Sequence, residues 1–559
     1  MKRVAWVFLL AAAACFGAQS AVPWWQHALI YEVYPRSFQD SDGSGIGNLR
    51  GIAERLDYLK SLGVNAIWLT PIYPSPQVDF GYDISDYGAI DPQYGTMVDF
   101  DRLLEEAHRR SIRVIMDLVL NHTSDQHKWF LESKSSRHNP KRDWYIWRDG
   151  KAPGKPPNNW RSDFGHSAWT YDAHTGQWYY HKFYAAQPDL NWRNPEVRKA
   201  MYNVARFWLR KGVDGFRLDA ITTLFEDPKL RDEPLLPGTN AFGEPNMGET
   251  RTNNLPEVHD VLRELRRVTD EFPGRVLIGE TYLPDIAELR KMYGKHNDEL
   301  QLPMDTQVGF INKLDVETFR RRIEEAETKL NGNMPLFVFD NHDNRRSWDR
   351  YGDGTHNAAI ARVIATVLLA SRSVALMYYG EEIGMVTTPP ARKEDVRDPV
   401  GLLLWPRFKG RDGERTPMQW DTSRNAGFTT GKPWLPIPPS YKMVNVETES
   451  REAGSLLEWY RRLIRLRATD AALRDGEEVM LDRNDDHVLA WLRRSAGGAP
   501  PVVVACNFTG APQTVKLDLK RLGISGTAAR TLAATDAAGD VPLASIKLAP
   551  FGVFVGEVR

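Results

Sequence analysis

The chain has 559 residues, of which 42% are hydrophobic and 26% are charged, so it can bury a large core and should fold as more than one domain. Its formal net charge of −1 at pH 7 gives no electrostatic reason to expect nucleic acid or an anionic membrane surface as a partner. The 18 tryptophans offer flat apolar faces, most of which we expect to find in the core.

The N-terminus has the pattern of an export signal. Two basic residues at positions 2–3 precede an apolar stretch at 4–14, and small residues then lead to a cleavage point after Ser20. The apolar stretch is too short to span a bilayer comfortably, and nothing later in the sequence resembles a membrane span. Residues 1–20 are therefore predicted to be a signal peptide, and the mature protein to be periplasmic or secreted.

The two cysteines give different information. Cys15 lies in the small-residue run and raises lipid attachment as the weaker alternative, because Ala12 stands where a leucine is usual for that modification. Cleavage after Ser20 leaves Cys506 alone, so we expect no internal disulfide.

Strand patterns alternate with amphipathic helical patterns over most of the chain, which is typical of a parallel α/β fold. Strands are predicted at residues 30–34, 66–69, 113–118, 215–218, 276–279, 300–304, 336–339 and 374–377. Helices are predicted at residues 50–62, 98–110, 195–211, 255–271, 316–330 and 357–370. Eight such strands predict a (β/α)₈ barrel, in which all strands end at the same face.

Two parts of the chain depart from this pattern. Residues 122–192 are rich in Trp, Pro and Gly, and we interpret them as a small domain inserted after the third strand. After a last helix at 454–468, alternating runs at 488–492 and 502–506 predict a C-terminal antiparallel β-domain. The predicted domains are the barrel (21–121 and 193–474), the inserted domain (122–192) and the β-domain (475–559).

Four segments place a carboxylate at or just past a predicted strand, namely residues 117–122, 216–220, 277–281 and 339–343. Strand alternation puts Arg217 and Asp219 on one face, and a guanidinium that close favours the ionised carboxylate that a nucleophile needs. Glu280 follows an apolar strand, where desolvation would raise its pKa and keep a proton for a leaving oxygen.

Asp219 and Glu280 together suit the nucleophile and the acid of a retaining glycosidase, whose carboxyl groups lie roughly 5–5.5 Å apart. Asp343, beside His342, would hold sugar hydroxyls in the transition state. Each carboxylate alone is more often an ion-pair or capping group. Their joint occurrence at strand ends favours the catalytic interpretation.

In this order, these segments resemble the four signature regions of the α-amylase superfamily, glycoside hydrolase family 13. Residues 187–192 (Gln-Pro-Asp-Leu-Asn-Trp) and 415–420 (Arg-Thr-Pro-Met-Gln-Trp) resemble markers of its oligo-1,6-glucosidase and α-glucosidase branch. The resemblance runs from about Trp24 into the C-terminal domain. It implies that the nucleophile, the acid/base and the transition-state stabiliser are Asp219, Glu280 and Asp343.

The same resemblance implies a pocket for the terminal glucose of the substrate. The matched residues are Tyr82, Asp83, His122, Phe164, Gln187, Arg217, His342 and Arg415. The two histidines lie in polar, loop-like contexts, which disfavours a role in the core, whereas Tyr82 could also simply pack. Asp117 is expected to brace the site rather than to react.

Residues 40–48 place oxygen-bearing residues at alternate positions among glycines, which is how a loop wraps a hard cation. The loop resembles the calcium-binding loop of this branch, which implies ligands from Asp40, Asp42, Ser44, Ile46 and Asn48. Ser44 and Asn48 stand where acidic residues are common. We therefore expect weaker Ca²⁺ binding, Mg²⁺ binding or an ordinary glycine-rich turn; the cation would be structural, because the chemistry needs no cofactor.

The resemblance implies an exo-acting α-glucosidase that releases terminal α-linked glucose from short oligosaccharides with retention. A sugar acceptor could compete with water and give transglucosylation. Ala220 follows the nucleophile, where valine tends to accompany α-1,6 activity in this branch and smaller residues α-1,4 activity, so we expect a preference for α-1,4 links.

Several alternatives stay open at this stage. An oligo-1,6-glucosidase, a trehalose synthase-like enzyme and a sucrose-directed enzyme would share the same acids. A non-catalytic relative, like the heavy chains of amino-acid transporters, is disfavoured because all three acids and a cleavable signal are present. A polysaccharide-binding module conflicts with the pocket residues. No oligomeric state is predicted.

Overall fold

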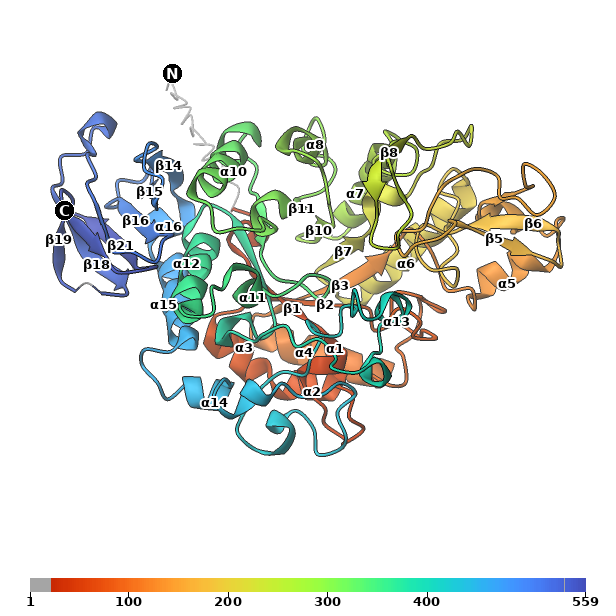
Figure 1. Ribbon diagram of the computed structural model, residues 1–559, viewed down its shortest axis with the longest axis horizontal. Helices are drawn as coiled ribbons and strands as arrows, with labels where there is room; N and C mark the ends of the chain where they lie inside the picture. Colours follow the sequence, from red (N-terminus) through yellow and green to blue (C-terminus); the bar gives the residue numbers. More distant parts are fainter. Residues whose placement is uncertain (1–21, 537) are drawn as a thin grey trace, which may run out of the picture.

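The structure is a computed structural model that describes residues 22–536 and 538–559. At its centre is a closed barrel of parallel strands in the order β1-β13-β12-β11-β10-β7-β3-β2 (Figure 1). These strands are β1 (Leu29–Val33), β2 (Ala66–Leu69), β3 (Arg113–Val119), β7 (Gly215–Asp219), β10 (Val276–Gly279), β11 (Leu302–Asp305), β12 (Leu336–Val338) and β13 (Val374–Tyr378). All eight lie where the sequence predicts them, and the (β/α)₈ barrel is confirmed.

Two predictions concern export and membrane spans. The predicted signal peptide, residues 1–20, lies outside the described residues. Within the described part of the chain, no helix combines the length and apolarity needed to cross a bilayer.

Helices surround the barrel and largely follow the predicted ranges. They include α2 (Leu49–Glu54), α3 (Leu56–Leu62), α4 (Met97–Arg109), α6 (Pro195–Lys211), α7 (Val258–Asp270), α10 (Val316–Lys329) and α12 (Asn357–Ala370). The prediction of one helix over 50–62 is wrong, because Arg55 (φ −102°, ψ 4°) leaves the helical conformation and separates α2 from α3. Helix α6 shows how local sequence sets the bounds: Asn194 caps its N-terminus, Pro195 begins it, and Gly212 ends it in a left-handed conformation.

A lobe follows β3, as predicted. It contains α5 (Lys128–Ser135) and a three-stranded antiparallel sheet in the order β4-β6-β5, formed by Trp147–Arg148, Gln177–Tyr180 and Trp169–Asp172. Its core is aromatic: Trp160, Trp169 and Tyr180 are buried together. Figure 1 shows this lobe at one end of the molecule, beside the carboxyl end of β3.

A second excursion follows β7 and was not predicted. It carries a hairpin of β8 (Leu235–Thr239) and β9 (Pro245–Met247). Every residue of β8 is exposed, so the strand has no alternation of apolar and polar residues by which the sequence could reveal it. An ion pair of 2.9 Å between Arg161 and Glu244 joins this hairpin to the inserted lobe.

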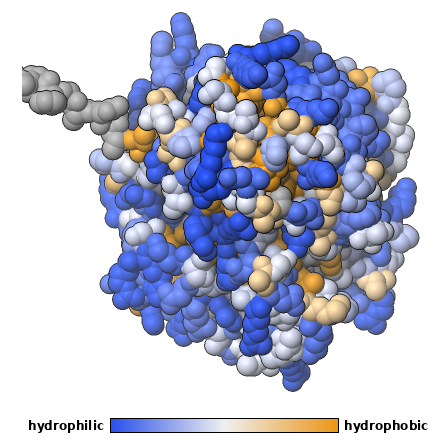
Figure 2. Space-filling model, turned by 90° about the vertical axis from the view of Figure 1, so that its left-hand side faces the viewer, coloured by the Kyte–Doolittle hydropathy of each residue, from blue (hydrophilic) through white to orange (hydrophobic). Residues whose placement is uncertain are grey.

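The opposite end of the molecule is the predicted C-terminal β-domain. Its six-stranded antiparallel sheet has the order β14-β15-β16-β21-β18-β19, formed by Glu477–Leu481, Val488–Arg494, Val502–Asn507, Val553–Val558, Ala528–Ala534 and Asp540–Pro542. Helix α15 (Leu456–Thr469) precedes the sheet and packs on α12. Figure 2 shows this end, where hydrophilic residues cover most of the surface and hydrophobic ones show between them. Cys506 is buried in β16 and is a free thiol.

Candidate active site

A cavity of about 410 Å³ lies at the carboxyl ends of the barrel strands. Asp219 enters it from the end of β7, Glu280 from the residue after β10, and Asp343 from the loop after β12. Phe164 and Phe183 of the inserted lobe close one side. The structure thus brings together the three carboxylates that the sequence places at separate strand ends.

Arg217 links three carboxylates beneath this cavity. Its Nη1 atom is 2.6 Å from Asp219 Oδ1 and 3.0 Å from Asp117 Oδ2, and its Nη2 atom is 2.6 Å from Glu280 Oε1. Asp117 also accepts a hydrogen bond of 3.1 Å from the Tyr82 hydroxyl, so it braces the site as predicted. Because one guanidinium faces three buried carboxylates, at least one of them favours its protonated form near neutral pH.

Burial raises the pKa values of all three carboxylates. Burial raises the pKa of Glu280 to about 7, although Arg217 opposes the shift. Burial likewise raises the pKa of Asp219 to about 7, again against the attraction of Arg217, and Asp117 adds to the rise. Arg217 does favour the ionised form of Asp219, as expected, but burial and the neighbouring Asp117 outweigh it. Burial also raises the pKa of Asp117, to about 6, so near neutral pH the three carboxylates around Arg217 titrate together.

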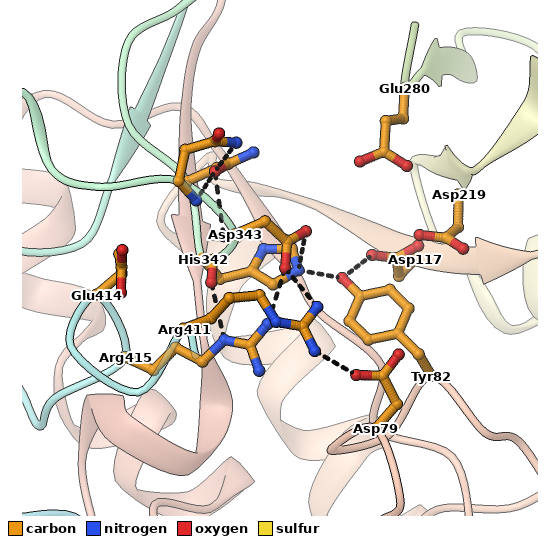
Figure 3. Close-up of polar contacts among 12 residues, drawn as sticks. Asp79, Tyr82, Asp117, Asp219, Glu280, His342, Asp343, Arg411, Glu414 and Arg415 are labelled. Atoms are coloured by element: carbon orange, nitrogen blue, oxygen red, sulfur yellow. Dashed lines mark hydrogen bonds and ion pairs between the residues drawn. The ribbon is translucent and has the colours of Figure 1, made fainter. Parts of the chain in front are cut away.

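Asp343 has the opposite environment. Its Oδ1 atom is 2.8 Å from Arg415 Nη2 and 3.0 Å from Arg411 Nη1, and its Oδ2 atom is 3.2 Å from His342 Nε2 (Figure 3). Burial alone would raise the pKa of Asp343, but these contacts with His342 and the two arginines outweigh burial and hold it well below its usual range. Asp343 is therefore an ionised carboxylate at neutral pH, unlike the Asp219–Glu280 pair.

Five of the eight predicted pocket residues do not line the cavity, and for two of them, Asp83 and Arg415, a residue four positions earlier in the sequence does. The oxygens of Asp83 accept hydrogen bonds from the Ser75 hydroxyl and from backbone N–H groups of residues 78 and 79, so Asp83 holds a turn. Arg415 is 1% exposed and lies behind Asp343. Their places are taken by Asp79 and Arg411, which line the cavity and form an ion pair of 2.8 Å (Figure 3).

The other predicted pocket residues divide into two groups. Tyr82, His122 and Phe164 line the cavity. The remaining three lie directly behind the lining: Gln187 Nε2 is 3.1 Å from His122 Nε2, the His342 ring stacks on Tyr82, and Arg217 lies beneath the acids. Burial lowers the pKa of His122 and of His342 to about 3, so both imidazoles are neutral at pH 7.

Sequence reasoning also missed several lining residues on irregular segments. Asp163 of the inserted lobe and Glu249 after the β8–β9 hairpin line the cavity, and both contact the buried ammonium of Lys182, at 2.8 and 3.4 Å. Tyr282 follows Glu280 by two residues and is 46% exposed. None of these three positions lies in a periodic sequence pattern that could mark it. For Arg411 there was a signal, because the Arg-Asp-Gly-Glu-Arg run at 411–415 contains two arginines.

The predicted cation loop is held by its own hydrogen bonds. Asp40 accepts hydrogen bonds from the backbone N–H groups of Asp42, Gly43 and Gly45, at 2.9, 3.0 and 2.8 Å. The Ser44 hydroxyl donates to the carbonyl oxygen of Ile46 at 3.1 Å. Asn48 caps α2 by accepting a hydrogen bond from the Gly51 N–H.

Within the described residues, no group of three or more His, Cys, Asp or Glu side chains could hold a metal ion. A cation here would therefore depend on hydroxyl, amide and backbone oxygens beside Asp40 and Asp42.

Comparisons with known proteins agree with this arrangement. Residues 32–476 match the family model described as alpha amylase, catalytic domain. A probable alpha-glucosidase of Rhizobium meliloti is 40% identical over 511 residues, covering 89% of this chain and 92% of that protein. An oligo-1,6-glucosidase of Parageobacillus thermoglucosidasius is 39% identical over 523 residues, covering 87% of this chain and 90% of that protein. The crystal structure of the alpha-glucosyl transfer enzyme XgtA superimposes with a TM-score of 0.88 at 38% identity, covering 96% of this chain and all of that chain.

Proposed function

We propose, from the premise that this chain belongs to the α-amylase family and is a glycoside hydrolase, that it is an exported, exo-acting, retaining α-glucosidase acting on short oligosaccharides. The observation that carries the proposal is that three carboxylates line one cavity, and that the pKa is raised for two of them and lowered for the third. The pKa values of Asp219 and Glu280 are raised to about 7, whereas that of Asp343 is lowered, so that Asp343 is ionised.

The proposed reaction has two steps. Asp219, as the carboxylate, attacks the anomeric carbon and forms a glycosyl ester, while Glu280 transfers its proton to the departing glycosidic oxygen. Water then attacks the same carbon and gives its proton to Glu280, and the bond to Asp219 breaks. Two displacements restore the original anomeric configuration. A sugar hydroxyl in place of water would give transglucosylation.

The remaining polar groups suit the terminal glucose. Asp79 and Arg411, paired at 2.8 Å, present an acceptor and donors side by side at the cavity wall. We propose that they bind hydroxyl groups of the terminal sugar, together with Tyr82 and His122. Asp343 would hold hydroxyl groups more tightly in the transition state than in the ground state, which lowers the barrier.

The cavity's charge favours an uncharged sugar. Among the described residues that line it, six are carboxylates, and Arg411 is the single arginine or lysine. A phosphorylated sugar would add negative charge to a site already rich in it. We therefore infer that neutral oligosaccharides are the substrates.

Timed product analysis on maltose, isomaltose, sucrose, trehalose and maltotriose tests the proposal. The expected result is glucose released one unit at a time from maltose and maltotriose. Conversion of maltose to trehalose, or of sucrose to another disaccharide, would favour an isomerising enzyme with the same acids. No reaction with any of these sugars would contradict the proposed function.

The pH dependence of the proposed reaction follows from the Asp219–Glu280 pair. We expect a bell-shaped kcat/KM profile on maltose with a maximum near pH 7. As the pH falls through the pKa of Asp219, the nucleophile gains a proton and activity is lost; as it rises through that of Glu280, the acid loses its proton. On an aryl glucoside, Glu280→Gln should remove the basic limb and keep the acidic one. A basic limb that survives this substitution would assign it to another group.

Linkage preference is proposed to depend on Ala220. This residue lines the cavity, and its backbone N–H donates a hydrogen bond of 2.9 Å to Glu280 Oε2. A larger side chain here would crowd the leaving-group sugar, and a methyl-scale difference is worth about 1–3 kcal/mol. We propose that the small alanine favours α-1,4 links, so that maltose is cleaved faster than isomaltose.

The variant Ala220→Val is expected to lower kcat/KM on maltose by roughly tenfold more than on isomaltose. Ala220 has a positive φ of 45°, where a β-branched residue is strained, so the ratio of the two substrates is the informative quantity. Ala220→Gly is the matched control, because glycine relieves the strain and keeps the space. Equal losses on both sugars in Ala220→Val would show that strain, and not linkage, is the cause.

We also propose that the loop of residues 40–48 binds Ca²⁺ or Mg²⁺ weakly, in a structural role. Adding a chelator is expected to lower the melting temperature, because a cation that binds only the folded form stabilises it. Turnover at temperatures well below the transition should not change. In Asp40→Asn the melting temperature should be lower and no longer respond to the chelator. A wild-type melting curve that does not change in chelator would identify the loop as a turn only.

A further inference from the structure

Glu32 is a buried acidic residue behind the active site. It lies on β1, is 0% exposed, and its Oε1 atom is 2.6 Å from His342 Nδ1. Within residues 22–536 and 538–559, no arginine or lysine forms an ion pair with Glu32, and its Oε2 atom has no hydrogen-bond partner. An ionised carboxylate here would be a buried charge without a contacting cation, which is costly. The surroundings of Glu32 therefore favour the carboxylic acid.

His342 connects Glu32 to the catalytic groups. Its other ring nitrogen, Nε2, is 3.2 Å from Asp343 Oδ2 and 2.8 Å from the Tyr82 hydroxyl (Figure 3). The ring stacks on Tyr34 and on Tyr82, with interplanar angles of 20° and 8°. Packing thus fixes the plane of the ring, and the partners of its two nitrogens decide which nitrogen carries the proton.

A proton on Nε2 of the neutral His342 ring satisfies every contact. Nε2 then donates to Asp343 and to the Tyr82 hydroxyl, and that hydroxyl donates its own proton to Asp117 Oδ2 at 3.1 Å. Nδ1 is left as an acceptor, so Glu32 at 2.6 Å must be the donor, which requires the carboxylic acid. In this arrangement each contact joins a donor to an acceptor.

A proton on Nδ1 fits these contacts less well. Nε2 would then present its lone pair to the carboxylate of Asp343 at 3.2 Å, and two acceptors would face each other. The pKa values agree with the first arrangement. Burial raises the pKa of Glu32 well above its usual range against the attraction of Arg217, and the negative charge of Asp343 adds to the rise. Glu32 is therefore uncharged at pH 7, as His342 is.

We propose that Glu32 is a positioning residue, which as a carboxylic acid donates a hydrogen bond to His342 Nδ1 and so keeps the ring proton on Nε2, where it binds Asp343. A donor at Nδ1 excludes the alternative tautomer, because two donors would then face each other. The inference rests on the proposed function, in which Asp343 holds sugar hydroxyls in the transition state. Removing the donor at position 32 should therefore affect kcat more than KM.

Two variants of Glu32 test its effect on turnover. Glu32→Met has no donor, and its kcat on maltose is expected to fall about 10- to 100-fold with little change in KM, the usual cost of losing a group that orients a site residue. Glu32→Gln is uncharged and its amide N–H donates, so it should stay within a few-fold of the wild type. Equal losses in both variants would show that the ionised carboxylate is needed, and no loss in either would remove Glu32 from the site.

The matched control is Glu382→Met. Glu382 is also a buried glutamate at 0% exposure, and it accepts hydrogen bonds from the hydroxyl groups of Tyr31 and Tyr58, but it does not line the cavity. The variant is expected to lower the melting temperature and to keep kcat. A fall in kcat as large as that of Glu32→Met would show that the loss reflects stability, and would contradict the positioning role.

Nitrogen NMR of the protein labelled with ¹⁵N-histidine tests the direction of the hydrogen bond. The His342 signals are assigned by their loss in His342→Asn. We expect the proton on Nε2 in the wild type and in Glu32→Gln, and a shift of the Nδ1 signal toward that of a nitrogen without a hydrogen bond in Glu32→Met. A wild-type proton on Nδ1, or an Nδ1 signal unchanged in Glu32→Met, overturns the proposal.

The NMR result does not depend on activity. A wild-type enzyme that cleaves no α-glucosidic sugar would overturn the proposed function, while the spectrum would still decide whether Glu32 donates to His342. The two failures are therefore distinguishable.

Discussion

The variant Asp219→Asn is expected to fold like the wild type and to lose turnover by on the order of 10⁴-fold or more. The amide has the shape of the carboxylate and can still contact Arg217, but it cannot form the glycosyl ester. Folding should not suffer, because burial already penalises the ionised carboxylate, as its raised pKa shows. Turnover on maltose and the melting temperature are the two measurements.

The chain offers a matched control for this variant. Asp305 is also a carboxylate at the end of a barrel strand, is 1% exposed, and has a pKa raised by burial to about 7. It caps α9 (Thr306–Gly309) and does not line the cavity. Asp305→Asn should therefore keep most of the turnover. An Asp219→Asn enzyme as active as Asp305→Asn would remove Asp219 from the nucleophile role.

The loss of turnover in the variant Glu280→Gln is expected to depend on the leaving group of the substrate. General acid catalysis contributes about 10²- to 10⁴-fold, and a sugar leaving group needs all of it, whereas a nitrophenolate leaves without a proton. Turnover on maltose should fall by this factor, and the first step on p-nitrophenyl α-glucoside should be largely spared. The raised pKa of Glu280 supports this role, because it keeps the proton available near neutral pH.

Burst kinetics would extend this second test. If Glu280 also activates the water of the second step, as proposed, the glutamine variant should accumulate the glycosyl ester on Asp219 and release nitrophenol in a burst. Equal losses on maltose and on the aryl glucoside, without a burst, would show that Glu280 positions the substrate and does not transfer the proton.

Much of the fold follows from local sequence patterns. Short, mostly apolar runs mark the barrel strands because parallel strands are buried on both faces, as β13 shows with all its residues buried. The pattern fails where an element has no buried face. Strand β8, which is exposed throughout, is the example. The pattern also fails at Arg55, where the chain leaves the helical conformation although the helical spacing of apolar residues continues.

The site shows the same division between strands and loops. Asp219 and Glu280 were predictable because they lie at or next to strand ends, where alternation and neighbouring residues fix their surroundings. Asp79 and Arg411 lie on loops 332 residues apart in sequence, and only the folded chain pairs them. Motif matching selected Asp83 and Arg415 instead, because the motifs give the segment but not which of two similar side chains turns toward the cavity.

Electrostatics was the least predictable part of the site. A single neighbouring arginine suggested an ionised Asp219, but the final pKa depends on burial and on Asp117, which is 102 residues away in sequence. The same burial acts on Asp343, where His342 and two guanidinium groups reverse its effect. The net effect of burial and several charged neighbours on a pKa can be worked out only from the three-dimensional structure.

The central claim is that this enzyme releases single glucose units from the chain end with retention, and proton NMR during the first minutes of maltotriose cleavage tests it most directly. With retention, α-glucose appears first together with maltose, and the β-anomer grows in later by mutarotation. β-Glucose as the first product would contradict the two-step role of Asp219 and Glu280.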